Sequence, residues 1–257
     1  MRNQPLTGYV LHQKPYQDHR SLTYFFSQER GLVHGIGKKN LPLFSCISLF
    51  ASGKNSLKNF SQSQLTAKTC MLNGQGQFAG LYLNELLLKL LPVEESSEHL
   101  WQAYDHCLAQ IHSLYQIPPL DATMQSQLLK FYLRQFETEL LNNLGYGVDF
   151  YKDALGDEIT QNQSYYYQLQ RGFMPADTDT DTEPSSAILL AGKAIYQWRH
   201  VLQHPEQLDL HSQQSSLWVN QTINLLSKIY KQVIDDLVNY ETLQSRELWH
   251  QLAQFGR

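Results

Sequence analysis

Three features are scarce in this chain of 257 residues, and each scarcity excludes a class of protein. The longest apolar stretch, residues 78–91, falls short of the roughly 18 to 20 residues that a membrane helix needs. The segment Met1–Pro5 leads into alternating residues rather than an apolar stretch, so we expect no secretory signal. The chain has three cysteines, Cys46, Cys70 and Cys107. They are too few and too widely spaced to form a disulfide framework or a CxxC metal pair. We expect a cytoplasmic protein with reduced thiols.

Acidic residues are almost missing from the first 80 positions, which contain only Asp18 and Glu29. Nine basic residues there give 9 − 2 = +7, and the remainder has 20 − 9 = 11 bases and 24 − 2 = 22 acids, a net −11. A basic segment of this size concentrates polyanions and binds phosphates by counterion release. Nucleic acid is therefore the first partner to consider.

Residues 7–72 alternate with the two-residue period of half-buried strands, broken by Gly and Pro turn signals. Five or so short strands without helix-length crossovers predict a small closed barrel of the OB type. Such barrels bind single strands with a basic groove and stacking aromatics. The candidate DNA contacts are Lys14, Arg20, Lys38, Lys39, Lys54, Lys58 and Tyr16. Tyr9 and Tyr24 could also stack on bases, or fill the barrel.

Beyond Phe78 the apolar spacing becomes helical. We expect helices from Phe78, from a cap at Ser96 or Ser97, and from Asp121 to a stop at Gly145. Further helices are expected near residues 186–201 and 216–239, followed by a short one capped by Ser245. The fold class is thus α+β, with an OB-type barrel at 1–77 and a mainly α-helical domain at 78–257.

The helical pattern lapses at about residues 150–184. Tyr165–Leu169 and Phe173, joined across Arg171-Gly172, predict a small hairpin. The alternating acids and threonines of 177–183 predict a solvated loop rather than a calcium site, because the Gly and the closing bidentate Glu of an EF-hand are missing at their required offsets.

Several segments together resemble the bacterial RecO family of recombination mediators. Tyr9–Tyr16 and Gly31–Lys38 resemble its first strands, and Gly80–Leu86 its central helix. Leu133–Phe150 is the closest stretch, and Ser245–Leu248 resembles the last helix. Each motif is weak alone, but the ordered set runs nearly from end to end.

The resemblance implies a non-enzymatic DNA repair protein that binds single- and double-stranded DNA and anneals complementary strands. It also implies docking on the C-terminal tail of single-stranded DNA-binding protein and cooperation with RecR to load RecA. Lys14, Lys38 and Lys39 lie at or beside positions that are basic in the family. For the acidic tail, the matching positions are Arg134, Leu140 and Leu144, and Leu141 shares nearly the same helical face as Arg134. The alternative is that the leucines are ordinary core and Arg134 a surface charge.

Two departures from the family pattern bear on function. Lys38-Lys39 is followed by Asn40–Leu43 rather than by a run of basic residues, so DNA affinity is expected to be weaker or shifted to other lysines. Some family members have a four-cysteine zinc site in the region matching 150–184, where this chain has no cysteine. We expect no metal and no cofactor.

Two other functions stay open from the sequence. The barrel could have lost DNA binding, which would leave a protein–protein adaptor. Gly74-Gln-Gly76-Gln-Phe-Ala79 satisfies G-x-G-x-x-A before a helix, which would suit a nucleotide-dependent enzyme. The alternation of strands and helices that a Rossmann domain needs does not follow, which favours a linker.

Overall fold

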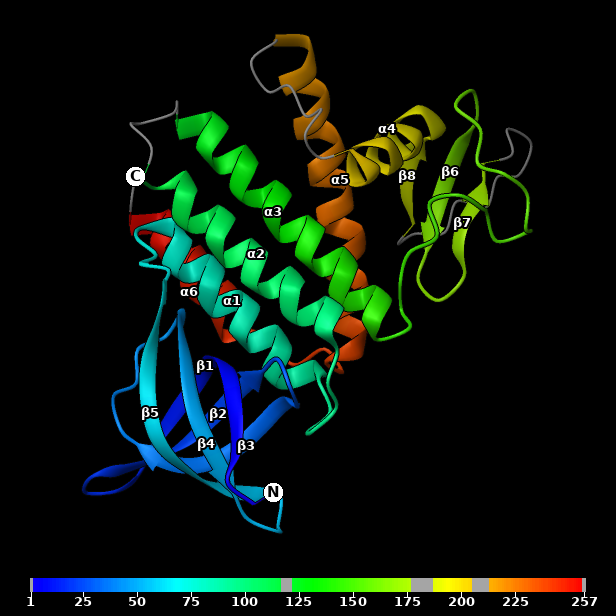
Figure 1. Cartoon of the computed structure of the whole chain (residues 1–257). Coiled ribbons are helices and arrows are strands. Elements are labelled where there is room, and N and C mark those ends of the chain that lie inside the picture. Colours follow the sequence, from blue (N-terminus) through cyan, green and yellow to red (C-terminus); the bar gives the residue numbers. More distant parts are fainter. Residues whose placement is uncertain (1, 117–121, 177–186, 205–212, 256–257) are drawn as a thin grey trace. The chain divides into compact units, whose positions relative to one another are not determined.

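The computed structural model describes residues 2–116, 122–176, 187–204 and 213–255 (Figure 1). Contacts divide the chain into two compact units, residues 1–120 with 241–257 and residues 121–240. The predicted boundary after residue 77 falls within the first turn of the first helix, which begins at Gln75. The two compact units divide the chain differently, because the first two helices and the last one belong to the same unit as the barrel. We describe each unit by itself.

Five strands close the N-terminal barrel: β1 (Gln4–Gln17), β2 (Arg20–Ser27), β3 (Gly31–Lys38), β4 (Ser45–Ser52) and β5 (Leu57–Thr69). Their order around the barrel is β1-β2-β3-β5-β4, and β4 returns to pair with β1. All neighbours are antiparallel except β3 and β5. A five-stranded barrel of OB type, followed by a mainly helical region, confirms the predicted α+β class.

Two glycines make room for an aromatic ring in the barrel interior. A Cβ atom on Gly35 would lie 2.5 Å from the ring of Phe60, and one on Gly37 would lie 2.9 Å from the Cβ of Phe60. Phe60 packs in the interior with Phe25 and Val33. The glycines of β3 are therefore needed for close packing against β5.

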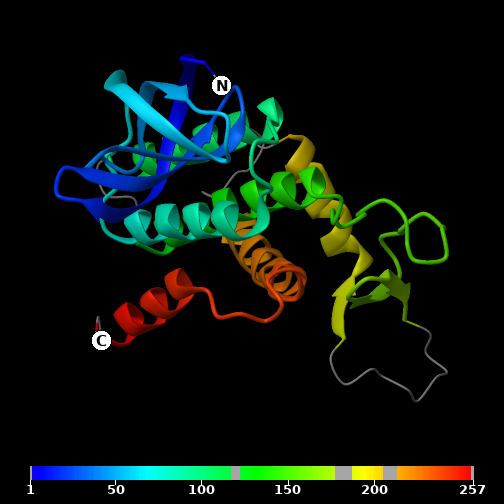
Figure 2. The ribbon, with the colours of Figure 1, turned by 90° about the horizontal axis from the view of Figure 1, so that it is seen from below.

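Three helices complete the first unit: α1 (Gln75–Leu90), α2 (Glu98–Leu114) and α6 (Gln244–Phe255). Helix α1 contacts β1, α2 and α6, and Figure 2 shows it beside the barrel. Ser97 caps α2 as expected, because its hydroxyl oxygen accepts a hydrogen bond from the Leu100 N–H at 3.2 Å. Ser245 was expected to cap α6 but lies inside its first turn.

Asn84 joins the barrel to two helices. Its side chain is 2% exposed and donates to the Leu11 carbonyl at 2.9 Å, and its amide oxygen accepts from the Tyr104 hydroxyl at 2.6 Å. One polar residue in an apolar helix thus connects β1, α1 and α2. Burial without partners would cost about 1–3 kcal/mol per polar group, so these bonds fix how the helices attach.

The second unit contains α3 (Ala122–Asn143), β6 (Ser164–Gln168), β7 (Gly172–Pro175), β8 (Ile188–Ala191), α4 (Gly192–Gln203) and α5 (Gln213–Leu237). Strands β6 and β7 form the predicted hairpin, and β8 adds a third strand beside β6. The start of the helix predicted over residues 186–201 is wrong. Residues 188–191 form strand β8, which pairs with β6, and the helix begins at Gly192. The expected cap Asp121 and acidic loop 177–183 lie outside the described residues.

Candidate nucleic-acid interface

Arg20, Lys38 and Lys39 form a basic edge where β2 begins and β3 ends. Arg20 and Lys38 are directly opposed across the two strands. The Arg20 guanidinium donates to the Ile36 carbonyl at 3.2 Å and to the Asn59 amide oxygen at 3.1 Å. Lys39 donates to the Asp18 carbonyl at 2.6 Å, whereas Lys38 is exposed. Three cations from neighbouring strands are thus held at one end of the barrel.

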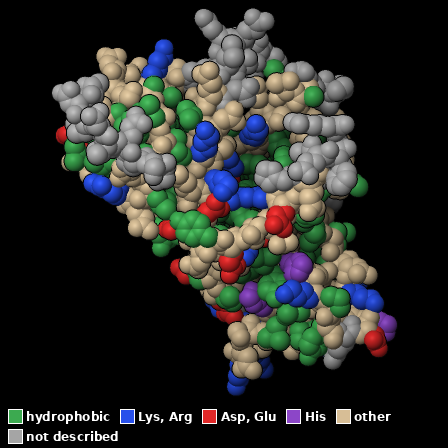
Figure 3. All heavy atoms as spheres, turned by 180° about the vertical axis from the view of Figure 1, so that it is seen from behind, with side chains coloured by type: hydrophobic (Ala, Val, Ile, Leu, Met, Phe, Trp, Pro, Cys, Tyr) green, Lys and Arg blue, Asp and Glu red, His purple; other side chains and the backbone are tan. Residues whose placement is uncertain are grey.

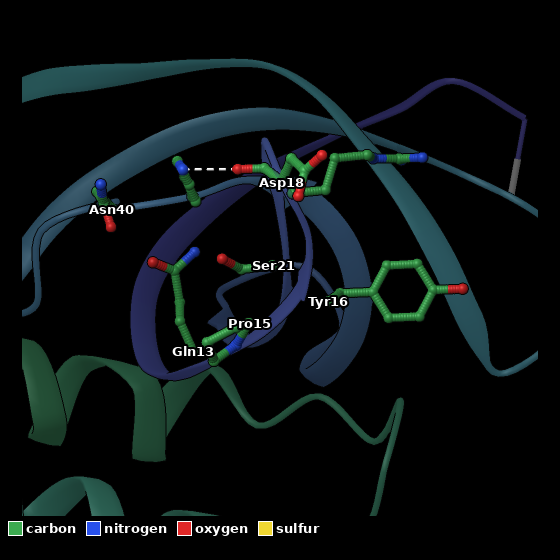
Figure 4. A pocket seen from close by; sticks show the side chains of 8 residues that line it. Gln13, Pro15, Tyr16, Asp18, Ser21 and Asn40 are labelled. Carbon is green, nitrogen blue, oxygen red and sulfur yellow. Dashed lines mark hydrogen bonds between the residues drawn. The ribbon is translucent and has the colours of Figure 1, made fainter.

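A cavity of about 650 Å³ opens at this edge. Arg20 and Lys39 line it together with Tyr16, Gln13 and Asp18. Tyr16 is 54% exposed, and Figure 4 shows its ring extending away from Gln13 and Ser21. An exposed ring beside two cations, Arg20 and Lys39, is the combination that single-strand binding sites use, because bases stack on the ring while phosphates contact the charges.

Gln13 organises the cavity, although sequence reasoning did not single it out. Its amide donates to the Thr23 hydroxyl at 2.9 Å and to the Lys38 carbonyl at 3.1 Å. Its amide oxygen accepts from the Leu41 N–H at 3.0 Å. Gln13 thereby ties the segment that carries Lys38 and Lys39 to β1. An isolated glutamine in a strand gives no sequence signal for such a role.

Lys54 and Lys58 were predicted together but have different surroundings. Lys54 is exposed in the turn between β4 and β5. Lys58 is 4% exposed, and its ammonium lies 2.6 Å from a Glu94 carboxylate oxygen and donates to the Asn55 carbonyl at 2.5 Å. We therefore leave Lys58 out of the proposed DNA surface, because its charge is already neutralised inside the unit.

Of the tyrosines considered for stacking, Tyr9 has no exposed surface. Its hydroxyl donates to the Asp105 carboxylate, and burial first, then this hydrogen bond, raises its pKa above the ordinary value. Its ring packs edge-on against Tyr104. Tyr9 therefore fills the barrel–helix interface and cannot receive a base.

Lys14 lies apart from the basic edge, beside a row of rings on β1, β2 and β3. Its ammonium is 5.8 Å from the centre of the Tyr24 ring. Tyr24 lies between His12 and His34, with ring centres 5.9 Å and 4.6 Å away. We call these three side chains the ring row. The sequence indicated Tyr24 but neither histidine, because only the pairing of the strands shows that His12 and His34 lie beside Tyr24.

Both imidazoles of the ring row have a pKa below the ordinary value of 6.5. Burial is the main cause for each, and the positive charge of Lys14 adds to it for His12. The rings are therefore neutral at pH 7.

The predicted tail site in the second unit falls on interior residues. The side chain of Arg134 is 12% exposed, forms an ion pair with Glu137 and donates to the Ser227 hydroxyl at 2.6 Å. Leu140 and Leu141 have no exposed surface, and Leu144 is half-buried. In this structure Arg134 is paired and Leu140 and Leu141 are buried, so they do not form an accessible cation beside an open apolar pocket; tail binding at these positions stays a prediction.

The Gly74 turn gives no support to a nucleotide site. Gly74 precedes α1 with φ of 52°, and a Cβ on Gly76 would lie 2.9 Å from the Tyr115 ring and 3.0 Å from Ile111. The side chains of Ile111 in α2 and of Tyr115, which follows α2, therefore fill the space beside the second glycine. The preceding strand belongs to a barrel rather than to a parallel βαβ unit.

Within residues 2–116, 122–176, 187–204 and 213–255, no three His, Cys, Asp or Glu side chains are grouped closely enough to hold a metal ion. Over the same part of the chain, no helix has the length and apolarity to cross a membrane.

Comparison with known proteins shows the class of protein: residues 73–187 match the family model described as Recombination protein O C terminal. The chain is 33% identical to the DNA repair protein RecO of Actinobacillus succinogenes over 177 residues, 65% of this chain and 70% of that protein. It is 31% identical to the RecO of Alteromonas mediterranea over 190 residues, 70% and 76% of the two chains. The chain belongs to the RecO family of DNA repair proteins.

Proposed function

We propose that this chain is a non-enzymatic recombination mediator that binds single- and double-stranded DNA through its barrel and promotes annealing. The main support for the proposal is the basic edge of Arg20, Lys38 and Lys39, because Arg20 and Lys39 line a cavity in which Tyr16 is exposed. A barrel segment of net +7 attracts DNA, while the acidic remainder of the chain does not. Lys14 and Lys54 extend the basic surface.

The partner side of the proposal rests on family membership. In a mediator of this family, RecR and the tail of single-stranded DNA-binding protein would bring the chain to coated strands and help load RecA. The buried position of Arg134 argues that a tail site, if the second unit holds one, uses other residues. The proposed location is the cytoplasm, at the nucleoid during repair.

Titration of labelled single-stranded DNA at several salt concentrations, followed by fluorescence anisotropy, tests the DNA part. The logarithm of the binding constant should fall against the logarithm of salt by about 0.7 per phosphate neutralised. The variant Lys38→Ala/Lys39→Ala should weaken all sequences similarly and flatten this slope.

A matched control is Lys193→Ala/Lys228→Ala, which removes two exposed charges from the second unit. It should leave affinity and slope nearly unchanged. Equal losses from the two double variants would show that overall charge, rather than the basic edge, governs binding. No binding by the wild type at low salt would leave the adaptor as the better description.

A further inference from the structure

The ring row crosses three neighbouring strands at one level of the barrel. Tyr24 faces His12 across the β1–β2 pair and His34 across the β2–β3 pair. The residues next to them, Phe25 and Val33, point into the barrel core. Because side chains alternate along a strand, the three rings lie on the outer side of the barrel.

The ring row forms one side of a groove of about 420 Å³. Leu81 and Leu88 of α1 and Leu248 of α6 line the same groove. The leucines are half-buried or exposed, and Leu248 is 43% exposed. Figure 3 shows one face of the molecule on which histidine side chains lie beside a Lys or Arg side chain and hydrophobic ones. The volume falls in the usual range of about 300–1,000 Å³ for ligand sites.

The charges around the groove favour an anionic ligand. Lys14 is the one Lys or Arg among the described residues that line it, and Glu85 the one acid. Both oxygens of Glu85 already accept hydrogen bonds, from the N–H groups of Gln244 and Ser245 and from the Ser245 hydroxyl. Lys14 has no such hydrogen-bonded acceptor among the described residues, and its ammonium lies over the Tyr24 ring.

One buried polar atom in the groove also lacks a partner. The Nε2 atom of His34 is inaccessible to solvent and makes no hydrogen bond within the described residues. Such an atom carries an energetic cost.

We propose that this groove holds one unpaired base of single-stranded DNA, packed between the ring row and the leucines, with the adjoining phosphate at Lys14. The proposal rests on the proposed DNA binding and adds a site that selects single strands. A base inside a duplex is stacked on both faces and paired at its edge, so it cannot enter the groove. Duplex DNA would use the basic edge alone.

The variant Tyr24→Leu of the full chain tests this selection. Its affinity for a single-stranded oligonucleotide should fall about 5- to 150-fold, the effect of losing one stacked base. Its affinity for blunt duplex DNA should change by less than about twofold. Tyr24→Phe keeps the ring and should behave as the wild type, and Tyr146→Leu, which removes a 56% exposed tyrosine from the second unit, is the matched control.

A direct probe avoids dependence on the folding of the variant. An oligonucleotide with one 2-aminopurine should lose fluorescence on binding the wild type, because that base stacks on the rings, and Lys14→Ala should weaken the quenching. If wild-type protein binds single strands without quenching, or if Tyr24→Leu weakens single-stranded and duplex DNA equally, the groove does not select an unpaired base. A peptide would then be the better occupant. Absence of any DNA binding by the wild type would instead overturn the proposed function itself.

Discussion

The carboxylate of Glu85 in α1 accepts two hydrogen bonds from Ser245 in the first turn of α6, from its N–H at 2.9 Å and from its hydroxyl at 2.5 Å. The other carboxylate oxygen accepts from the N–H of Gln244 at 2.9 Å. The first N–H groups of a helix have no partner within the helix. Glu85 therefore caps α6 from another helix and brings a negative charge to its positive end.

Replacing Glu85 by Ala should lower the free energy of unfolding by about 0.5–2 kcal/mol, the usual effect of losing an N-terminal cap. Urea denaturation followed by circular dichroism would measure it. Glu95→Ala removes an exposed carboxylate of the same unit and is the control. Equal stability of wild type and Glu85→Ala would show that water replaces the cap without loss.

The sequence identified both segments of this contact but not the contact itself. Residues 80–86 and 245–248 each matched the family, yet they lie some 160 positions apart. Spacing predicts which residues share one helix face, whereas pairing between helices depends on the tertiary fold. For the same reason the sequence gives no sign that Asn84 and Glu85, two polar residues within the apolar stretch 78–91, both bind neighbouring elements.

Gly35→Ala should destabilise the barrel by about 1–3 kcal/mol, the range for overpacking a core. The added Cβ would lie 2.5 Å from the ring of Phe60, and neither strand can retreat within a closed barrel. Phe60→Leu removes the opposing ring atoms, so the double variant should lose less stability than the two single losses added together. Strict additivity in thermal or urea denaturation would mean that the clash is relieved elsewhere.

Charge counting predicted a basic barrel, and the structure gathers Arg20, Lys38 and Lys39 at one edge. Counting could not separate Lys54 from Lys58, because the partner Glu94 lies beyond β5 in the sequence. Alternation predicted strands well, but it gave Lys54 and Lys58 the same signal, although Lys54 is exposed in the turn before β5 and Lys58 is buried on β5 itself. The alignment of His12, Tyr24 and His34 could not be predicted either, because it depends on the register in which β1, β2 and β3 pair.

Lys58→Met should cost about 1.5–3 kcal/mol near pH 7, the range for hydrogen bonds to charged groups. The expected loss lies at the lower end because the Glu94 side chain is 24% exposed. The hydrogen bond from Lys58 is the main cause that holds the pKa of Glu94 below its ordinary value of 4.5. The contribution is therefore complete above pH 4.5 and is lost as pH falls through the lowered pKa.

Denaturation of wild type and Lys58→Met at several pH values checks this pair. The difference between them should shrink below pH 4.5, and Lys54→Met, which changes an exposed neighbour, should show neither the loss nor the pH dependence. A constant difference down to pH 3 would rule out the Glu94 ion pair as its source.

The ring row should make the protein less stable as pH falls below 6.5. The unfolded chain binds protons to its histidines at about that pH, whereas burial keeps the pKa of folded His12 and His34 lower. Lys14, Tyr24 and Glu85 surround these rings in the groove, and Lys58, on the neighbouring β5, is occupied by Glu94. His34→Gln should reduce the loss of stability between pH 7 and pH 5. An unchanged pH profile would place the responsible group elsewhere.

Arg134→Ala should destabilise the second unit by about 3–5 kcal/mol, the cost of removing one partner from a buried ion pair. Glu137 has no exposed surface, so its carboxylate would lose the neighbouring guanidinium without gaining water. The bond from Arg134 to Ser227, which joins α3 to α5, would be lost as well. The double variant Arg134→Met/Glu137→Leu removes both charges and should recover much of the loss. Lys130→Ala, one turn earlier and exposed, is the control.

The same variants decide between two roles for Arg134. If its role is structural, binding of an acidic tail peptide should follow the folded fraction, and the stable double variant should bind like the wild type. If Arg134→Ala keeps wild-type stability and yet loses the peptide, Arg134 is the tail anchor that the family resemblance implied, and its ion pair with Glu137 must open on binding. The buried geometry favours the structural role, because freeing the guanidinium would leave the Glu137 carboxylate without its ion-pair partner in the interior.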